Sequence, residues 1–206
     1  MELVLATGNA GKVAELAPLL APLGIRLRPQ SDFGVSEAVE SGLSFAENAL
    51  IKARHASRRA GLPALADDSG LCVDALDGAP GIYSARYAGP RAGASANNEK
   101  LLQALMGIPA GKRGAHFHAT LAFVRHANDQ EPLLAEGRWF GTILDSPQGE
   151  GGFGYDPLFF VPEYGCSAAQ LVPGIKNRVS HRGQAVARFL SLFQERLRTG
   201  ELKPGI

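Results

Sequence analysis

The sequence has little cysteine, no excess of either charge and no long hydrophobic run. Its two cysteines, Cys72 and Cys166, are far apart and form neither a CxxC pair nor a Cys/His spacing, so we expect neither a disulfide scaffold nor a zinc site. The 21 basic and 20 acidic residues give a formal net charge of +1. This balance disfavours binding of a long nucleic acid by its backbone, whereas a small anion needs only a few local cations.

Segments that would direct the chain to a membrane are also lacking. No run approaches the roughly 18 apolar residues of a membrane span, and the first apolar run, Leu3 to Ala6, is too short for the core of a signal peptide. We therefore expect a cytoplasmic protein. The 206 residues are 45% hydrophobic and 20% charged, which is typical of a globular chain with one substantial domain or two small lobes.

Strand-like and helix-like segments alternate along the chain. The run Leu3 to Ala6 is typical of a short buried strand, and a helical pattern follows from Val13 to Leu20. Ser44-Phe45-Ala46-Glu47 is a capping box, which predicts that a helix begins there. The segments 116–124 and 133–143 are predicted to be paired strands. Other expected elements are a strand at 64–66, a helix at 97–106 and a helix from about residue 180. The alternation predicts an α/β fold, and the strand pair favours a mixed sheet.

The first candidate site is the loop Thr7-Gly8-Asn9-Ala10-Gly11-Lys12, which lies between the first strand and the first helix. Backbone N–H groups at a helix start, together with a lysine, form an anion site. The loop is two residues too short for a Walker A motif, and Val13 stands where that motif has the Ser or Thr that binds magnesium. A glycine turn with a surface lysine is the alternative, so the loop alone predicts only that an anion binds.

The second candidate is Asp67-Asp68-Ser69-Gly70, which is expected at the end of a short strand. Adjacent carboxylates repel each other unless a cation or hydrogen-bond donors compensate. Magnesium prefers such hard oxygen ligands and leaves room for water and phosphate. Glu40, in the acidic stretch 37–40, is a candidate for a further oxygen ligand. The alternative is a polar turn capped by an aspartate.

Two more groups lie on the predicted helices. Asn48, Lys52 and His55 follow one another at steps of four and three, so they share one helix face. His181 and Arg182 stand in the first turn of the last helix, where cations oppose the helix dipole. A bound anion or polar ligand would favour them there. A solvated helix face and a surface basic patch are the alternatives.

A glycine-rich segment, Gly151 to Pro157, completes the set. Its glycines permit close approach of the backbone, and Phe153 and Tyr155 are candidates to sandwich a flat ring. A glycine turn with two core aromatics is the alternative. A phosphate loop, an acid pair, an aromatic platform and basic residues that read a base together describe a nucleotide site.

The same residues resemble the inosine triphosphate pyrophosphatase family, and within it the bacterial dITP/XTP pyrophosphatase branch. The resemblance covers nearly the whole chain and rests on several long motifs in the right order. These are Ala6-Thr7-Gly8-Asn9 with Lys12, Phe45 to Ala49 with Lys52-Ala53, Ala66 to Leu71, Gly78 to Tyr87, Gly151 to Pro157, and Ser180-His181-Arg182.

The resemblance implies a two-lobed α/β fold around an elongated mixed sheet, with the site in a central cleft and residues 1–206 forming one catalytic domain. It implies homodimers, magnesium, and cleavage of ITP, dITP and XTP to the monophosphate and pyrophosphate, which cleanses the nucleotide pool. No nucleic-acid or membrane partner is expected. This chain departs from the family pattern at Gln170 and Gly174, where family members often carry acids. The resemblance therefore does not fix the local loop structure or the ranking among substrates.

The resemblance also implies a role for each matched residue. Glu40 and Asp68 match the metal ligands, with Asp67 as a further candidate, and Asp68 matches the proton acceptor. Substrate contacts are implied for Thr7, Gly8, Asn9, Ala10, Gly11, Lys12, Lys52, Ser69, Phe153, Gly154, Tyr155, Asp156, Lys176, His181 and Arg182.

Three rival functions are compatible with parts of this pattern. A pyrophosphatase of the Maf type, acting on pyrimidine or modified nucleotides, would have a different first loop and no Ser-His-Arg motif. A non-catalytic nucleotide sensor is disfavoured by the presence of Asp67, Asp68 and Lys52 together. An RNA-binding module is disfavoured by the near-neutral charge.

Overall fold

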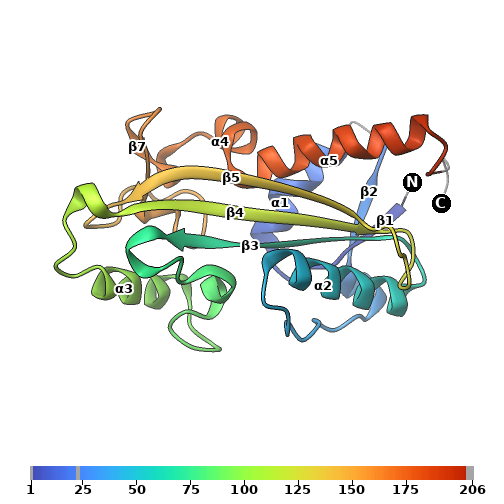
Figure 1. The fold of residues 1–206 in the computed structure, drawn as a ribbon, viewed down its shortest axis with the longest axis horizontal. Helices are drawn as coiled ribbons and strands as arrows, with labels where there is room; N and C mark the ends of the chain where they lie inside the picture. The colour runs from blue at the N-terminus through green and yellow to red at the C-terminus, as the bar shows by residue number, and fades with distance from the viewer. Residues whose placement is uncertain (1, 22–23, 203–206) are drawn as a thin grey trace. The chain divides into compact units, whose positions relative to one another are not determined.

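A computed structural model describes residues 2–21 and 24–202 and shows seven strands in one sheet (Figure 1). The strand order is β2-β1-β3-β4-β5-β6-β7. Parallel pairing joins β1 to β2 and to β3, and antiparallel pairing joins β5 to β6 and β6 to β7. The predicted α/β class with a mixed sheet is therefore confirmed. The strands are β1 (Glu2–Leu5), β2 (Arg26–Pro29), β3 (Ala64–Val73), β4 (Gly114–Val124), β5 (Leu133–Ile143), β6 (Phe159–Val161) and β7 (Cys166–Ser167).

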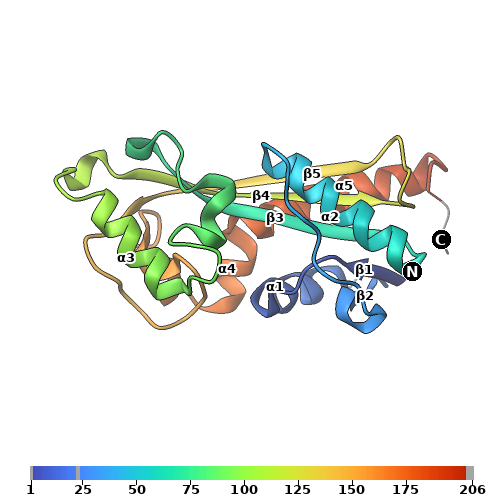
Figure 2. The same cartoon turned by 90° about the horizontal axis from the view of Figure 1, so that it is seen from below.

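Five α-helices, besides short 3-10 turns, are found in the described residues (Figures 1 and 2). None of them is long and apolar enough to cross a membrane. Their bounds are α1 (Ala10–Leu20), α2 (Phe45–Ala60), α3 (Ala94–Ala104), α4 (Pro173–Val179) and α5 (His181–Arg198).

The chain divides into two compact units, which share the long strands. Unit 1 comprises residues 1–68, 119–137 and 181–206, and unit 2 comprises residues 69–118 and 138–180. In unit 1 the sheet is covered on both faces, as the alternation along β1 shows. Leu3 and Leu5 pack with residues of α1 and α5, whereas Val4 and Ala6 pack with the alanines of α2. This period of two places one set of side chains on each face of the strand.

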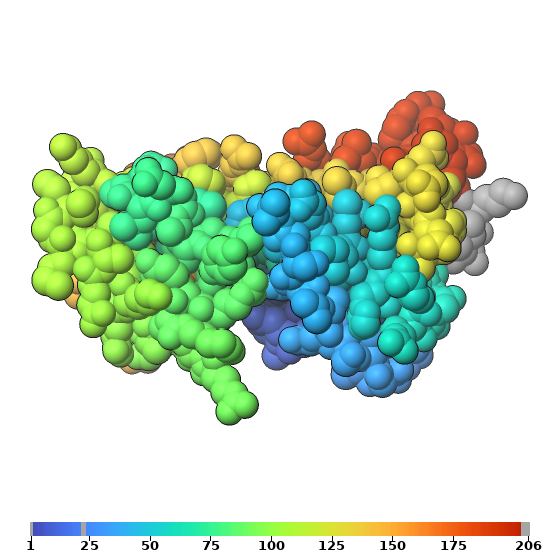
Figure 3. Space-filling model, turned by 60° about the horizontal axis from the view of Figure 1, so that its bottom comes forward, coloured from blue at the N-terminus to red at the C-terminus, as the bar shows by residue number. Residues whose placement is uncertain are grey.

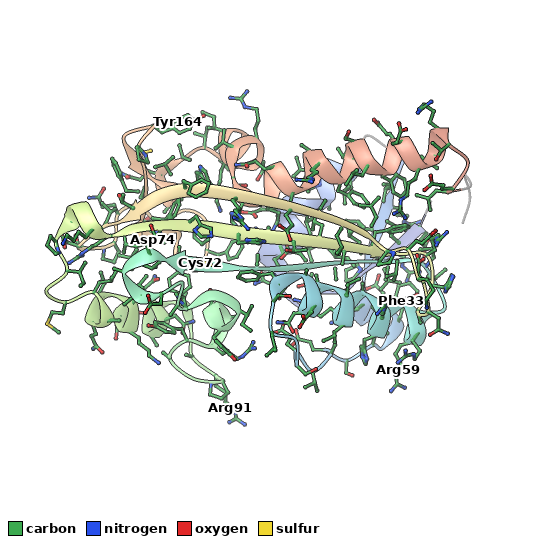
Figure 4. The ribbon with its side chains drawn as sticks, viewed as in Figure 1. Phe33, Arg59, Cys72, Asp74, Arg91 and Tyr164 are labelled. Atoms are coloured by element: carbon green, nitrogen blue, oxygen red, sulfur yellow. The ribbon has the colours of Figure 1, made fainter. Side chains whose placement is uncertain are left out.

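Unit 2 has its own core of aromatic and aliphatic side chains. Phe117, Trp139 and Phe159 lie together, with ring centroids 4.6 to 6.4 Å apart, and Leu101 and Leu105 from the α3 region pack against the same cluster. Aromatic rings at such separations favour each other beyond the area that they bury. Cys72 and Cys166 belong to this unit and are both free thiols; Cys72 lies near Asp74 at the end of β3 (Figure 4).

Helix α2 begins where the sequence predicts. Ser44 is its N-cap, and its hydroxyl accepts a hydrogen bond from the Glu47 N–H at 3.2 Å. Glu47 in turn accepts a bond from the Leu43 N–H at 2.7 Å. The helix ends at Gly61, whose φ of 69° is a left-handed conformation that suits glycine.

Several sequence-based boundaries differ from the structure, among them those of the helix expected at 97–106, which is α3 at Ala94–Ala104. The strand expected at 64–66 continues to Val73, so Asp67 and Asp68 lie inside β3 and not at its end. The acid pair nevertheless lies beyond the end of a neighbouring strand, because β1 stops at Leu5, which pairs with Leu65. Helix α1 begins three residues before Val13, and a short helix, α4, precedes the predicted last helix.

Candidate active site

The first candidate loop joins β1 to α1 and is built around Asn9. Asn9 is the N-cap of α1, and its side-chain oxygen accepts hydrogen bonds from the N–H groups of Gly11 and Lys12 at 2.9 and 3.2 Å. Thr7 accepts a bond from the Asn9 N–H at 3.1 Å. Within the described part of the chain, the N–H groups of Gly8 and Ala10 meet no acceptor. Two backbone donors at an exposed helix start are therefore available to an anion.

A carboxylate lies over this loop. A Cβ atom on Gly8 would be 2.6 Å from Oε1 of Glu37, which is closer than real contacts allow. Glycine at this position therefore permits the approach of Glu37. The segment that carries Glu37 is at the surface of unit 1 (Figure 3). The sequence singled out the acidic stretch for Glu40 only.

The second group joins Glu40, Lys52 and Asp68, all in unit 1. The Lys52 ammonium lies 2.5 Å from Oδ1 of Asp68 and 3.1 Å from Oε1 of Glu40. Asp68 is 6% exposed, and burial raises its pKa above the ordinary value although the Lys52 charge opposes this shift. Its other oxygen, Oδ2, is buried and has no hydrogen-bond partner among the described residues. Two carboxylates thus converge on one cation, and one carboxylate oxygen is left for a further ligand.

The polar face of α2 holds the segment that carries Glu40. Asn48 accepts a hydrogen bond from the Gly42 N–H at 2.8 Å, Lys52 binds Glu40, and His55 Nε2 lies 3.0 Å from the Ser36 carbonyl. The three side chains that the sequence placed on one helix face therefore all contact residues 36–42.

The third group surrounds Asp67, whose side chain is fully buried. Oδ1 is 2.5 Å from the Lys12 ammonium, and Oδ2 accepts a hydrogen bond from Arg182 Nε at 2.8 Å. The guanidinium also pairs with Glu15, through Nη1. Burial alone would raise the pKa of Asp67, but the charges of Arg182 and Lys12 outweigh it and hold that pKa far below its usual range. We name Lys12, Asp67, Arg182 and Glu15 the aspartate bridge.

The last helix begins as predicted, with His181 and Arg182 as its first residues. Both side chains are buried, at 5% and 2% exposure. The cations in this first turn are therefore not a surface basic patch, because Arg182 faces two carboxylates inside unit 1.

The remaining candidates form a separate group in unit 2. Oδ2 of Asp156 accepts hydrogen bonds from the Phe153 N–H at 2.7 Å and from the Lys176 ammonium at 2.8 Å. The same ammonium lies 5.2 Å from the centre of the Phe153 ring. Asp156 and Lys176 are both buried, and together they fix the backbone and the ring of Phe153. Ser69, half-buried on β3, follows Asp68 directly along the chain.

The two aromatics of the glycine-rich segment differ in environment. Phe153 is half-buried, whereas Tyr155 is buried in the core and donates a hydrogen bond to the Ser84 carbonyl at 2.8 Å. The carbonyl of Gly154 accepts a bond from Asn98 on α3 at 3.1 Å. Gly152 and Gly154 have φ values of 71° and 65°, a conformation that glycine adopts without strain.

Sequence reasoning missed Glu15, Glu37 and Asn98. Glu15 stands three residues after Lys12, so helical spacing already puts both on one side of α1. No pattern in the sequence shows that Glu15 meets Arg182, 167 residues away along the chain.

Within residues 2–21 and 24–202, no cluster of three or more His, Cys, Asp or Glu side chains is arranged to hold a metal ion. Magnesium, however, is usually held by one or two carboxylates together with water and substrate phosphates. Glu40 and Asp68, with the partnerless Oδ2 of Asp68, fit that smaller requirement. Asp67 fits it less well, because both of its oxygens are in ion pairs, Oδ1 with Lys12 and Oδ2 with Arg182, although Oδ1 has no hydrogen bond among the described residues.

Comparison with known proteins places this chain among relatives that share nearly its full length. The sequence profile of the Ham1 family matches residues 3–192. A curated dITP/XTP pyrophosphatase of Thioalkalivibrio sulfidiphilus is 57% identical over 196 residues, which are 95% of this chain and 100% of that protein. Another of the same name, from Xanthomonas oryzae, is 59% identical and covers 90% of this chain and 93% of its own.

A solved structure agrees with these relatives. The HAM1 protein from Coxiella burnetii superposes with a TM-score of 0.88 at 47% identity, covering 95% of this chain and 99% of that chain. Both the sequence and the fold support one conclusion: the chain belongs to the Ham1 family.

Proposed function

We propose that this protein hydrolyses the non-standard purine nucleoside triphosphates dITP, ITP and XTP to the monophosphate and pyrophosphate, with magnesium as cofactor. Curated relatives more than 55% identical to it are named dITP/XTP pyrophosphatases. Its role would be to remove these nucleotides from the pool before they enter DNA or RNA. The observation that carries the proposal is the group of Glu40, Lys52 and Asp68, with Oδ2 of Asp68 buried and partnerless among the described residues.

Glu40 and Asp68 would hold the magnesium ion, which when bound offsets phosphate charge and makes the α-phosphorus more electrophilic. Asp68 would orient the attacking water and accept its proton. A carboxylate whose pKa is raised by burial is better matched to this task than an ordinary aspartate. Lys52 contacts both carboxylates, so it would keep them in place and offset charge on the leaving pyrophosphate.

The loop Thr7 to Lys12 would hold the phosphates. The N–H groups of Gly8 and Ala10 are available as donors, and Lys12 adds a positive charge. Ser69 is a further candidate for a phosphate contact, since it follows Asp68 on β3.

Base selection would follow from hydrogen-bond polarity. Hypoxanthine and xanthine present an oxygen at position six, where adenine presents an amino group. Donors such as Arg182 and His181 would pair with that oxygen, and adenine would leave them unsatisfied, which costs about 1–3 kcal/mol for each buried group. Phe153 would supply a platform for the purine ring, with its backbone held by Asp156 and its ring in contact with the Lys176 ammonium. Guanine also has an oxygen at position six, so the protein must reject guanine by its amino group at position two.

The proposal includes two further properties, of which the first is implied by the family resemblance and the second is expected from the sequence. We propose that the protein forms homodimers and that it acts in the cytoplasm. Analytical ultracentrifugation would test the first, and fractionation of cells would test the second.

One assay tests the proposed function against its rivals. Pyrophosphate release is measured from dITP, XTP, dGTP, dATP and dUTP, each with and without magnesium. We expect release from dITP and XTP only, and only with magnesium. Preference for dUTP would favour a pyrimidine-directed pyrophosphatase, and no release from any substrate would favour a nucleotide sensor.

The role of Asp68 is tested by Asp68→Asn, which keeps the shape of the side chain but removes its basicity. We expect turnover of dITP to fall by about two orders of magnitude or more, as in other losses of a general base. The exposed residue Asp77, changed to Asn, is the control and should retain turnover. Near-normal turnover in Asp68→Asn would remove this residue from the mechanism.

A further inference from the structure

Asp67 has no role in the function proposed above, although it is the most buried carboxylate near the site. Its side chain is 0% exposed, and it lies inside β3 between Ala66 and Asp68. Asp67 and Asp68 are adjacent, yet they have different partners. Each has one buried oxygen without a hydrogen bond among the described residues, Oδ1 in Asp67 and Oδ2 in Asp68. In Asp67 this oxygen lies 2.5 Å from the Lys12 ammonium in an ion pair and Oδ2 binds Arg182, whereas the ion pair of Asp68 with Lys52 uses its other oxygen, Oδ1.

We propose that Asp67 is a positioning residue that couples the phosphate-binding lysine, Lys12, to the base-reading arginine, Arg182. This inference rests on the proposed function, because it assigns those two tasks to Lys12 and Arg182. It also excludes Asp67 from the metal ligands. Asp67 itself contacts neither the substrate nor the metal.

Asp67 lies where three elements of unit 1 meet. Lys12 belongs to the first turn of α1, Asp67 to the middle of β3 and Arg182 to the first turn of α5. Three segments that are far apart in the sequence thus meet at one carboxylate. Lys12 is held twice, because its ammonium also donates to the Asp67 carbonyl at 3.2 Å. A shift of Asp67 would therefore move both cations together.

Two carboxylates fix the orientation of the Arg182 guanidinium. Asp67 binds Nε of Arg182, and Glu15 binds Nη1, so two edges of the planar guanidinium are taken by carboxylates. A planar group held at two points has a fixed plane. Glu15 pairs with Arg182, whereas Asp67 pairs with both Arg182 and Lys12. Within the aspartate bridge, Glu15 contacts the proposed base-reading residue. Asp67 contacts both that residue and Lys12, which we propose binds the phosphates.

The charges around Asp67 disfavour a metal ion there. The aspartate bridge has two carboxylates and two cations, so the buried charges balance. Buried charges are tolerated when they are paired and hydrogen-bonded, and a magnesium ion at Asp67 would have to displace Lys12 or Arg182 from it. No such displacement is needed at Asp68.

The test compares Asp67→Asn with Glu15→Gln in the full chain. For each we would measure KM and kcat for dITP and dATP, and the magnesium concentration that gives half-maximal activity. In Asp67→Asn we expect KM for dITP to rise about tenfold and the preference for dITP over dATP to fall about tenfold, as charge-assisted hydrogen bonds are lost. The magnesium requirement should change less than about twofold, since no metal ligand is lost. In Glu15→Gln only the base preference should fall.

If Asp67 had only a structural role, Asp67→Asn would lower kcat or stability. It would not combine a higher KM for dITP with a weaker preference for dITP over dATP. If Asp67→Asn does not fold, Asp67→Glu keeps the buried charge and displaces it by one methylene; it should show both shifts. Wild-type KM and base preference in Asp67→Glu would overturn the proposal. So would a rise of about tenfold in the magnesium requirement of Asp67→Asn, because that would identify Asp67 as a metal ligand.

The unmodified protein is assayed first in the same series. Absence of pyrophosphate release from dITP by that protein would refute the proposed function. Normal release by that protein, with KM and base preference unchanged in both Asp67 variants, would refute the positioning role alone.

Discussion

Neighbouring carboxylates in this protein differ in what surrounds them. Asp67 is enclosed by two cations, Asp68 by one, and Glu37 by none within the described residues, since it lies over the exposed loop at Gly8. The environment, and not the residue type, therefore decides whether an acid is structural, reactive or an obstacle to an anion. Glu37 stands close to Gly8, which carries one of the two backbone donors that we expect a phosphate to use.

The variant Glu37→Gln tests whether Glu37 hinders phosphate binding. Removal of one negative charge beside the phosphate loop should lower KM for dITP by about two- to fivefold and leave kcat unchanged, since one exposed charge contributes about 1 kcal/mol or less. The effect should shrink in high salt, which screens exposed charges. Glu163→Gln, an exposed charge change in unit 2, is the control. A higher KM in Glu37→Gln would mean that Glu37 assists binding.

At the scale of elements, α2 serves both the fold and the site. Its alanine face packs against β1, β3 and β4, where small side chains allow close approach of helix and sheet. Its polar face holds residues 36–42, and Lys52 on that face reaches Glu40 and Asp68. The position of Glu40 thus depends on Asn48 and His55, which are not expected to touch the metal.

Asn48→Ala tests this dependence. The change leaves the Gly42 N–H without its acceptor, which should lower the free energy of unfolding by about 1–3 kcal/mol in urea denaturation. It should also raise the magnesium concentration for half-maximal activity, because the segment that carries Glu40 loses one of its contacts with α2. Asn97→Ala is a matched control, since Asn97 is a buried helical asparagine that accepts the Ala88 N–H at 2.8 Å. That variant should lose similar stability and keep the magnesium requirement of the unmodified protein.

For the whole molecule, the loss of stability at low pH is the sum of contributions from its carboxylates. Asp129, between β4 and β5, accepts hydrogen bonds from the Arg125 side chain and from the N–H groups of Arg125 and Glu131. Burial would raise its pKa, but these bonds outweigh burial and the pKa lies well below the ordinary value. A carboxyl whose pKa is lowered by folding stabilises the protein above its unfolded pKa, and this contribution is lost as the pH falls toward the folded pKa.

The variant Asp129→Asn tests the direction of this pH dependence of stability. Above pH 4 the variant should be less stable than the unmodified protein in urea denaturation, because the ion pair with Arg125 is gone. Between about pH 4 and pH 2 the unmodified protein should lose more stability than the variant, since only the former has this carboxylate to protonate. Equal losses over that range would contradict the lowered pKa of Asp129.

The sequence by itself did not predict α4, β6 or β7, but it did predict the longer strands and helices and most of the candidate residues. Local patterns are enough for these, since the capping box at Ser44, the period of the strands and the glycine turns each act over a few residues. The expectations of a single domain, a homodimer and individual site roles stay predictions. Lengths were less predictable, because β3 continues through two aspartates whose charges are compensated only by Lys12, Lys52 and Arg182 from elsewhere in the chain.

Only the tertiary structure decided which charge meets which. Asp67 and Asp68 are equivalent in the sequence, yet successive side chains of a strand point to opposite faces, so the two acids meet different cations. Glu15 and Arg182 are 167 residues apart, and packing of α1 against α5 brings them together. Such long-range pairing depends on how helices cover the two faces of the sheet, and no local pattern contains that information.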